Sequence, residues 1–260
     1  MSKIRQKRDP EAGLLLRSYA VTQPAGSVIA WGSLDWGQLA YASRGVMNVH
    51  TEQGTWVVPP HRAVWIPAGV DHRVEMSGRV SVRTLYFARR LLRGLPRTCL
   101  AVNVPPLLRE LVLHAVRIGI LHRDVPSEVR LVRVLLDQIQ TLAVVPLQLP
   151  MPSDPRARRA AELLRQEPGE GRSLAQAARS AGASRRTLER LFLRETHMTL
   201  GRWRQRLRLV ESLRLLAAGH AVTRVALDVG YNSPSAFVSA FRRQLGTTPA
   251  RYFAPPRVQA

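Results

Sequence analysis

The feature that most constrains the fold is a proline-rich segment that divides the chain into two unlike parts. Within ten residues stand four prolines: Pro146, Pro150, Pro152 and Pro155. Because proline lacks a backbone N–H and fixes φ, neither a helix nor a central strand can run through such a segment. The chain of 260 residues also exceeds the usual size of a single domain. We therefore predict two domains joined by a linker at residues 147–155.

The part before the linker begins with a pattern typical of short strands. Between residues 20 and 90, valine, tryptophan, tyrosine and threonine are common, and glycine or proline recurs at short intervals. The stretches 46–50 and 80–86 roughly alternate between apolar and polar residues, which indicates strands with two different faces. Many short, evenly spaced strands favour a small sandwich or barrel, and we assign it to residues 1–95.

Residues 96–146 are predicted to be a helical segment. From Pro105 the apolar residues Leu108, Leu111 and Val112 fall at helical spacing, and a second helix is expected over 127–145 with Ser127 as its N-cap. Two interpretations remain open for this pair of helices, and they do not exclude one another. The helices pack on the strand domain, or they form the interface of a homodimer.

Everything after the linker is predicted to be helical and to contain a helix-turn-helix unit. Helices are expected over 156–166, 173–180 and 185–195, and the last two are separated by the turn 181–184. Gly182 permits a positive φ in this turn, and Ser184 can cap the following helix. A short helix, a glycine turn and a second helix with a basic face are typical of a unit whose second helix enters the major groove of DNA.

The same pattern recurs further along the chain. A short helix is expected over 222–229, a turn over 230–233 with Ser233 as cap, and a further helix from Pro234 to Gly246. Between the two units, residues 199–218 are predicted to form one long helix of about 30 Å, at 1.5 Å per residue. One turn of B-DNA is about 34 Å long, so the two recognition helices would fit successive segments of the major groove.

The charge of the chain agrees with a nucleic-acid partner. The formal net charge is +21, with 39 Lys+Arg against 18 Asp+Glu. Residues 151–260 carry 20 Arg against 8 Asp+Glu, or +12, and the first 150 residues carry the other +9. Such an excess suits a polyanion or an anionic membrane surface. Because the arginine excess runs through both parts, it also fits GC-rich coding, and charge alone does not establish DNA binding.

The segment 230–252, GYNSPSAFVSAFRRQLGTTPARY, resembles the signature of the AraC/XylS regulators, and the resemblance extends back to about Ser173. It implies two helix-turn-helix units joined by a long helix, in agreement with the pattern above, at residues 156–254. By position, the family's base-facing residues correspond to Arg186, Glu189, Arg190, Ser235, Ala236 and Ser239.

Contacts to DNA phosphates are expected from a second group of residues, namely Ser184, Arg185, Arg194, Ser233, Arg242 and Arg243. The family often has arginine where this chain has Ser239, so the first unit is expected to carry most of the sequence specificity. Arginine pairs with guanine and glutamate accepts from cytosine. Glu189 has an alternative role, which is to pair with Arg185 or Arg186 on the helix surface.

The N-terminal part resembles the cupin-type sensor domain of the same family, in the subgroup that contains the nitroimidazole-resistance regulators. The resemblance rests on residues 37–47 and 58–72. Of the histidines that hold metal in many cupins only His72 matches, since Gly32 and Leu34 stand where a pair is expected, and we predict no metal and no cofactor. A small-molecule effector is expected in a pocket lined by Trp36, Gln38, Tyr41, Trp65 and His72, although these residues also suit an ordinary core.

We therefore predict an α+β multidomain protein with a cupin-like barrel, two helices and a C-terminal all-α domain. Its function is that of a transcription regulator that binds an operator in double-stranded DNA, with RNA polymerase as partner if it activates. The alternatives are a cupin-type enzyme, for which no catalytic constellation is evident, and a protein that coats nucleic acid without specificity. The charged segment Met1–Glu11 lacks the apolar run of a signal peptide, and no run approaches a membrane span, so a cytoplasmic, non-membrane protein is expected.

Overall fold

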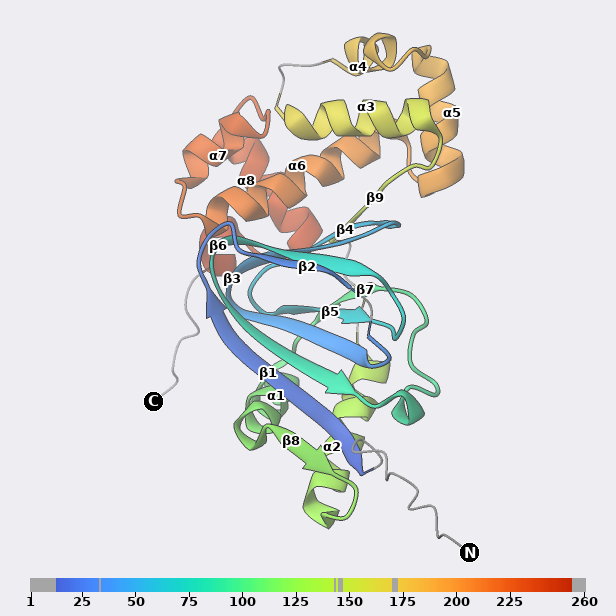
Figure 1. The fold of residues 1–260 in the computed structure, drawn as a ribbon. Helices are drawn as coiled ribbons and strands as arrows, with labels where there is room; N and C mark the ends of the chain where they lie inside the picture. The colour runs from blue at the N-terminus through green and yellow to red at the C-terminus, as the bar shows by residue number, and fades with distance from the viewer. Residues whose placement is uncertain (1–12, 33, 143, 145–146, 170–172, 254–260) are drawn as a thin grey trace, which may run out of the picture.

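The computed structural model describes residues 13–32, 34–142, 144, 147–169 and 173–253. A sheet is built mainly from the first part of the chain, and a group of helices from the last part lies over one side of it (Figure 1). This arrangement confirms the predicted α+β fold with a helical C-terminal part. The predicted features at Met1–Glu11, at 145–146 and at residue 254 lie outside the described residues.

The sheet is antiparallel, and its central strands are the two longest ones, β3 and β6. Within the described residues it has nine strands, and its main path runs β7-β5-β3-β6-β1-β8, while β2 pairs with β6 and β4 lies between β3 and β9. The bounds are β1 (Leu14–Gln23), β2 (Val28–Gly32), β3 (Gly37–Thr51), β4 (Gly54–Val58), β5 (Arg62–Ile66), β6 (His72–Phe87), β7 (Leu100–Asn103), β8 (Ile120–His122) and β9 (Gln148–Pro150).

A bulge bends the pair β3 and β6 near its middle. Their register runs from Gly37 opposite Phe87 to His50 opposite Arg73, and it shifts twice between Ala42 and Val46. Gly45 lies in this stretch with φ 76, and a Cβ atom there would collide with the carbonyl of Arg79. Only glycine fits such a position, and the bulge increases the local bend and twist of the strands.

The two faces of the sheet contribute to different cores because side chains alternate along a strand. On one face Tyr41 and Trp65 pack with Leu108 of α1 (Pro106–Ile118) and Leu135 of α2 (Pro126–Gln140). The α2 helix starts and ends earlier than predicted. Its N-cap is Val125 and not Ser127, because Pro126 supplies a ready-made φ for the first helical position.

The predicted linker is partly built into the sheet. Gln148–Pro150 forms β9 and pairs antiparallel with β4, with Leu149 opposite Thr55. A proline is tolerated here because β9 is a short edge strand and Pro150 stands at its end. The α3 helix then begins at Pro155, with Asp154 as N-cap. The domain boundaries stay predictions. The segment 96–146, predicted to be helical, also contributes β7 and β8 to the sheet, and the predicted linker contributes β9.

The helical part follows the predicted order closely. Its helices are α3 (Pro155–Gln166), α4 (Leu174–Ser180), α5 (Arg185–Thr196), α6 (Leu200–Ala217), α7 (Val222–Asp228), α8 (Pro234–Leu245) and α9 (Pro249–Phe253). The long α6 helix serves both units, since Trp203 packs with Phe192 of α5 while Leu213 belongs to the core that contains Phe237 of α8. None of the described helices is both long and apolar enough to cross a membrane.

Candidate nucleic-acid interface

Local hydrogen bonds define the first helix-turn-helix unit. The α4 helix begins with a capping box in which the Ser173 hydroxyl accepts from the Gln176 backbone N–H and the Gln176 side chain accepts from the N–H of Ser173. In the turn that follows, Gly182 has φ 69, and Ser184 caps α5 by accepting from the backbone N–H of Thr187 over 3.1 Å. These devices fix the angle between the helices and leave the outer side of α5 uncovered.

The structure brings the three predicted base-contacting residues of α5 together. Arg186, Glu189 and Arg190 are all exposed, and their spacing places them on one helix face. The Nε of Arg185 lies 2.9 Å from Glu189 Oε1, so the surface ion pair that was the alternative role of Glu189 is present in the structure. The guanidinium groups of Arg186 and Arg190 therefore lie on the exposed face of α5, beside the Arg185–Glu189 ion pair, whose charges cancel.

The second unit repeats this construction with a more closely packed turn glycine. Gly230 has φ 82 between α7 and α8, and Ser233 caps α8 by accepting from the Ala236 N–H over 3.2 Å. A Cβ atom on Gly230 would lie only 2.9 Å from the backbone carbon of Gly169 and 2.7 Å from the Arg208 guanidinium. The exposed face of α8 carries small side chains, those of Ser235, Ala236 and Ser239.

The residues predicted to contact phosphates occupy different environments. The hydroxyls of Ser184 and Ser233 accept helix-capping bonds, and Arg194 lies 2.6 Å from Glu195. Arg242 and Arg243 are exposed in the last turn of α8. The two arginines of α8 are the more available cations for a DNA backbone, since Arg194 already has a carboxylate partner.

Glu195 has a positioning role that the sequence did not suggest. Its Oε2 accepts hydrogen bonds from the backbone N–H groups of Ser153 at 2.9 Å and Asp154 at 3.0 Å, and from the Ser153 hydroxyl at 3.1 Å. The Asp154 N–H is the largest of the causes that lower the pKa of Glu195. The end of α5 is thereby tied to the start of α3, across 41 residues of sequence that no local pattern connects.

The five residues predicted to line an effector pocket do not meet in one cavity. Tyr41 and Trp65 lie in the core between the sheet and the helices α1 and α2. Gln38 is buried on the opposite face of β3, because strand alternation separates it from Tyr41. His72 stands at the start of β6, with Nδ1 2.9 Å from the carbonyl oxygen of Val70.

Trp36 does line a cavity, but with other neighbours. This cavity of about 430 Å³ is formed by Arg17, Ser18, Tyr19, Ile29, Leu34, Trp36 and Tyr86. The guanidinium carbon of Arg17 lies 4.2 Å from the centre of the Trp36 ring. The pairing of Arg17 with Tyr86 and of Gln38 with Tyr86 across adjacent strands places Arg17 and Gln38 on the same face of the sheet.

Metal-ligating and nucleophilic groups are sparse in the part of the chain that the structure describes. No three His, Cys, Asp or Glu side chains gather there as potential metal ligands. The Cys99 thiol is buried, and burial raises its pKa to about 12. Because the thiolate is the reactive form of cysteine, this thiol is a poor nucleophile at neutral pH.

Comparison with known proteins agrees with the two helix-turn-helix units. A family model described as "Helix-turn-helix domain" matches residues 177–254. The chain is 34% identical to the transcriptional regulator RipA of Corynebacterium glutamicum over 121 residues, which is 43% of this chain and 37% of RipA. It is 38% identical to the regulatory protein SoxS of Escherichia coli over 76 residues, or 29% of this chain and 71% of SoxS.

Solved structures of regulators also align with the chain. An AraC-type regulator from Chromobacterium violaceum is 28% identical over 42% of this chain and 97% of its own, with a TM-score of 0.38. The structure of ToxT from Vibrio cholerae with a bound unsaturated fatty acid is 11% identical over 93% of this chain and 95% of its own, also with a TM-score of 0.38.

The most extensive sequence similarity among these relatives covers both parts of the chain. The transcriptional regulator NimR of Escherichia coli is 36% identical over 218 residues, which is 84% of this chain and 80% of NimR. A match of this extent includes the sheet as well as the paired helix-turn-helix units. The chain belongs to the AraC/XylS family of DNA-binding transcriptional regulators.

Proposed function

We propose that α5 reads the operator of this regulator through Arg186 and Arg190. Both side chains are exposed on the outer face of a capped recognition helix, and this single observation carries the assignment. Arginine donates two hydrogen bonds to O6 and N7 of guanine, and a good bidentate contact is worth about 1–3 kcal/mol of discrimination. Glu189 accepts from a cytosine amino group only if DNA separates it from Arg185.

The α8 helix has a different part in this proposal. In this proposal the small side chains of Ser235, Ala236 and Ser239 face the groove. The phosphates of the DNA backbone are contacted by residues at the edges of the two units, namely Arg242, Arg243, Ser184, Ser233, Arg185 and Arg194. Small side chains make few contacts to base edges. The first unit thus supplies most of the specificity, and the second contributes affinity and register.

We propose that a small-molecule effector binds in the sheet domain at the cavity beside Trp36. Its lining is mostly aromatic and aliphatic, with Arg17 above the Trp36 ring, which suits a largely apolar ligand with one polar group. Gln38 lies on the same face of the sheet, while Tyr41 and Trp65 support the strand from behind. His72 lies apart, at the beginning of β6.

The remaining parts of the proposal concern partners and compartment. A homodimer through α1 and α2 is supported by the exposed apolar side chains of Leu107 and Val134 on those helices. RNA polymerase is the partner if the protein activates. The proposed role is cytoplasmic, non-enzymatic and independent of bound metal.

The direct test is a selection of genomic DNA fragments bound by the purified protein. We expect the wild type to enrich one motif with two half-elements about one helical turn apart. Arg186→Ala and Arg190→Ala should each weaken one half-element selectively. The matched control is Arg93→Ala, since Arg93 is exposed in the loop before β7, away from both units and from α1 and α2. Indiscriminate capture by the wild type and both variants would instead favour the non-specific coating protein.

A further inference from the structure

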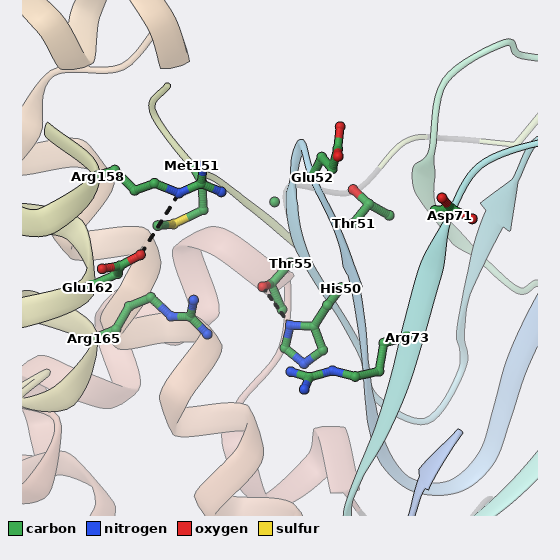
Figure 2. A pocket seen from close by; sticks show the side chains of 11 residues that line it. His50, Thr51, Glu52, Thr55, Asp71, Arg73, Met151, Arg158, Glu162 and Arg165 are labelled. Carbon is green, nitrogen blue, oxygen red and sulfur yellow. Dashed lines mark hydrogen bonds and ion pairs between the residues drawn. The ribbon is translucent and has the colours of Figure 1, made fainter. Parts of the chain in front are cut away.

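A second cavity lies between the sheet and the first helix-turn-helix unit, apart from the effector cavity at Trp36. It has a volume of about 500 Å³. Its walls come from the hairpin of β3 and β4, the start of β6, the segment after β9 and one side of α3, and Figure 2 shows these side chains around a common space. The lining residues that matter for binding are His50, Thr51, Thr55, Arg73 and Arg165.

The inner wall of this cavity is basic. Arg165 reaches from α3 towards the His50 ring, and Arg73 reaches towards the same ring from β6 (Figure 2). The imidazole Nδ1 of His50 lies 3.0 Å from the Thr55 hydroxyl, and its side chain is only 13% exposed. Two guanidinium groups from different domains thus point to one small volume that also holds a hydroxyl and an imidazole.

The carboxylates nearby are engaged or stand at the rim. Glu75 lies 3.3 Å from His50 Nε2 and 3.9 Å from Arg73, and Glu162 lies 3.9 Å from Arg158 on its own helix. Glu52 and Asp71 are exposed. In a smaller adjoining cavity, Glu211 is held by Arg214, with contacts of 2.9 and 3.1 Å to its two oxygens.

Arg165 differs from Arg73 and Arg158, which each lie near a carboxylate. It lines both cavities, yet it forms no ion pair with any carboxylate that the structure describes. Burial is the main cause that lowers the pKa of His50; the positive charges of Arg73 and Arg165 repel its protonated form as well, while Glu75 acts in the opposite direction. An anion placed between Arg73 and Arg165 would reduce this repulsion.

We propose that this interdomain cavity is a binding site for a small oxyanion, a metabolite that carries a carboxylate or phosphate group. The fork of a guanidinium matches the paired oxygens of such groups, and Thr51 and Thr55 supply hydroxyl donors. Because Arg73 belongs to the sheet and Arg165 to α3, the bound anion links the first helix-turn-helix unit to the sheet. The site is separate from DNA recognition and from the cavity at Trp36.

The test measures binding of a defined probe to the full chain without DNA. Inorganic phosphate and succinate are titrated separately against chloride at matched ionic strength, by calorimetry and by the NMR signals of the arginine Nε–H groups. We expect one of the two probes to shift the Arg165 and Arg73 signals, which identifies the preferred oxyanion. In Arg165→Gln the affinity for that probe should fall about tenfold, the effect of losing one charge-assisted hydrogen bond.

Two controls separate this site from the many other arginines. Arg159→Gln removes an exposed cation from the same helix outside the cavity and should leave binding unchanged. The pair Arg186→Ala and Arg190→Ala removes the proposed DNA readers and should also leave it unchanged, so failure of DNA readout and failure of this site are distinguishable. Equal losses in Arg165→Gln and Arg159→Gln, or no shift of the Arg165 signal by either probe, overturn the proposal.

A competition experiment with DNA distinguishes a free metabolite from a phosphate of the DNA backbone as the ligand of this cavity. A short operator duplex, once identified by fragment selection, is added to the protein saturated with the preferred probe. If the site binds a free small molecule, the Arg165 signal stays at its bound position. If the duplex displaces the probe and shifts Arg165 itself, the cavity receives a DNA phosphate, and the small-molecule assignment is wrong.

Discussion

The indole N–H of Trp203 donates a hydrogen bond of 2.7 Å to the carbonyl oxygen of Pro150. Trp203 is fully buried in α6 and packs edge-to-face on Phe192 of α5, with ring centres 5.3 Å apart. One side chain thus joins the long helix, the first recognition helix and the end of β9. The segment that the prolines keep out of helical structure is held in place by a residue 53 positions later.

Replacing Trp203 by phenylalanine should destabilise the protein. The Pro150 carbonyl would lose its partner inside the structure, and an unpaired buried polar group costs about 1–3 kcal/mol. The smaller ring also leaves a void beside Phe192. Urea denaturation measures the change in the free energy of unfolding, with Tyr19→Phe as control because Tyr19 is exposed. Equal stability of Trp203→Phe and wild type would show that the bond contributes nothing.

The two turn glycines should differ in their tolerance of alanine. Gly182 and Gly230 occupy matching positions with φ 69 and 82, a conformation that costs alanine about 1–2 kcal/mol. Gly182 has nothing within 4 Å of an added Cβ, whereas at Gly230 that atom meets Gly169 at 2.9 Å. We expect Gly230→Ala to lose roughly 1–3 kcal/mol more than Gly182→Ala, because the backbone must shift. Thermal or urea unfolding of the pair makes the comparison, and equal losses contradict the close approach.

A double-mutant cycle on α5 can decide the role of Glu189. If Glu189 only pairs with Arg185, the cycle of the two alanine variants should give a coupling of about 0.3–0.5 kcal/mol in stability and no change in the preferred DNA sequence. If Glu189 reads a cytosine, Glu189→Ala should also relax one position of the motif by about 1–3 kcal/mol. Competition binding with duplexes that differ at that base pair gives the answer.

The arginines of α8 should govern the salt dependence of binding more than its sequence preference. Arg242→Ala removes one proposed phosphate contact, so the slope of log affinity against log salt should become shallower by about 1, equally for operator and unrelated DNA. Arg186→Ala should weaken operator binding more than binding to unrelated DNA. Binding titrations of operator and unrelated DNA at salt concentrations from about 50 to about 200 mM test both expectations. A base-specific effect of Arg242→Ala would place that residue in the groove.

The bond between Glu195 and the start of α3 should make stability depend on pH in the acid range. The pKa of Glu195 is lowered in the folded protein, chiefly by the N–H of Asp154, from about 4.3 in an unfolded chain. Its contribution is therefore present above the unfolded pKa and is lost as the pH falls through the folded pKa. Glu195→Gln should be less stable than wild type at pH 7 and approach it below about pH 4. Urea unfolding at several pH values measures this, with Glu110→Gln on α1 as control.

The order of the helical half could be predicted from sequence because its signals are local. Ser173, Ser184 and Ser233 each cap a helix by bonding to a backbone N–H three residues ahead. Such bonds depend on a few neighbouring residues, so the pattern of serine, glycine and apolar positions marks helix ends to within about two residues. At the start of α2, Pro126 takes the first helical position, so the N-cap is Val125, two residues before the predicted Ser127.

The cavities could not be predicted in this way because they join distant segments. Alternation in β3 separates Gln38 from Tyr41, but it does not tell which face the helices α1 and α2 will cover. Trp36 was identified, whereas its neighbour Arg17 stands in another strand and gave no signal of its own. His50 and Arg165 meet only because the linker enters the sheet as β9 and turns α3 back over the β3–β4 hairpin.

The two recognition helices are attached to the sheet differently, because the second helix-turn-helix unit shares its buried core with the central strands. Side chains of β4 and β6, such as Val58 and Val82, belong to the same buried cluster as Phe237 of α8. The helices α3, α4 and α5 pack in a different cluster, together with the first half of α6 and Leu149 of β9. Local unfolding follows such clusters. We therefore expect the first recognition helix to unfold locally without exposing the core of the sheet, whereas α8 can leave the sheet only if their shared core is exposed to water.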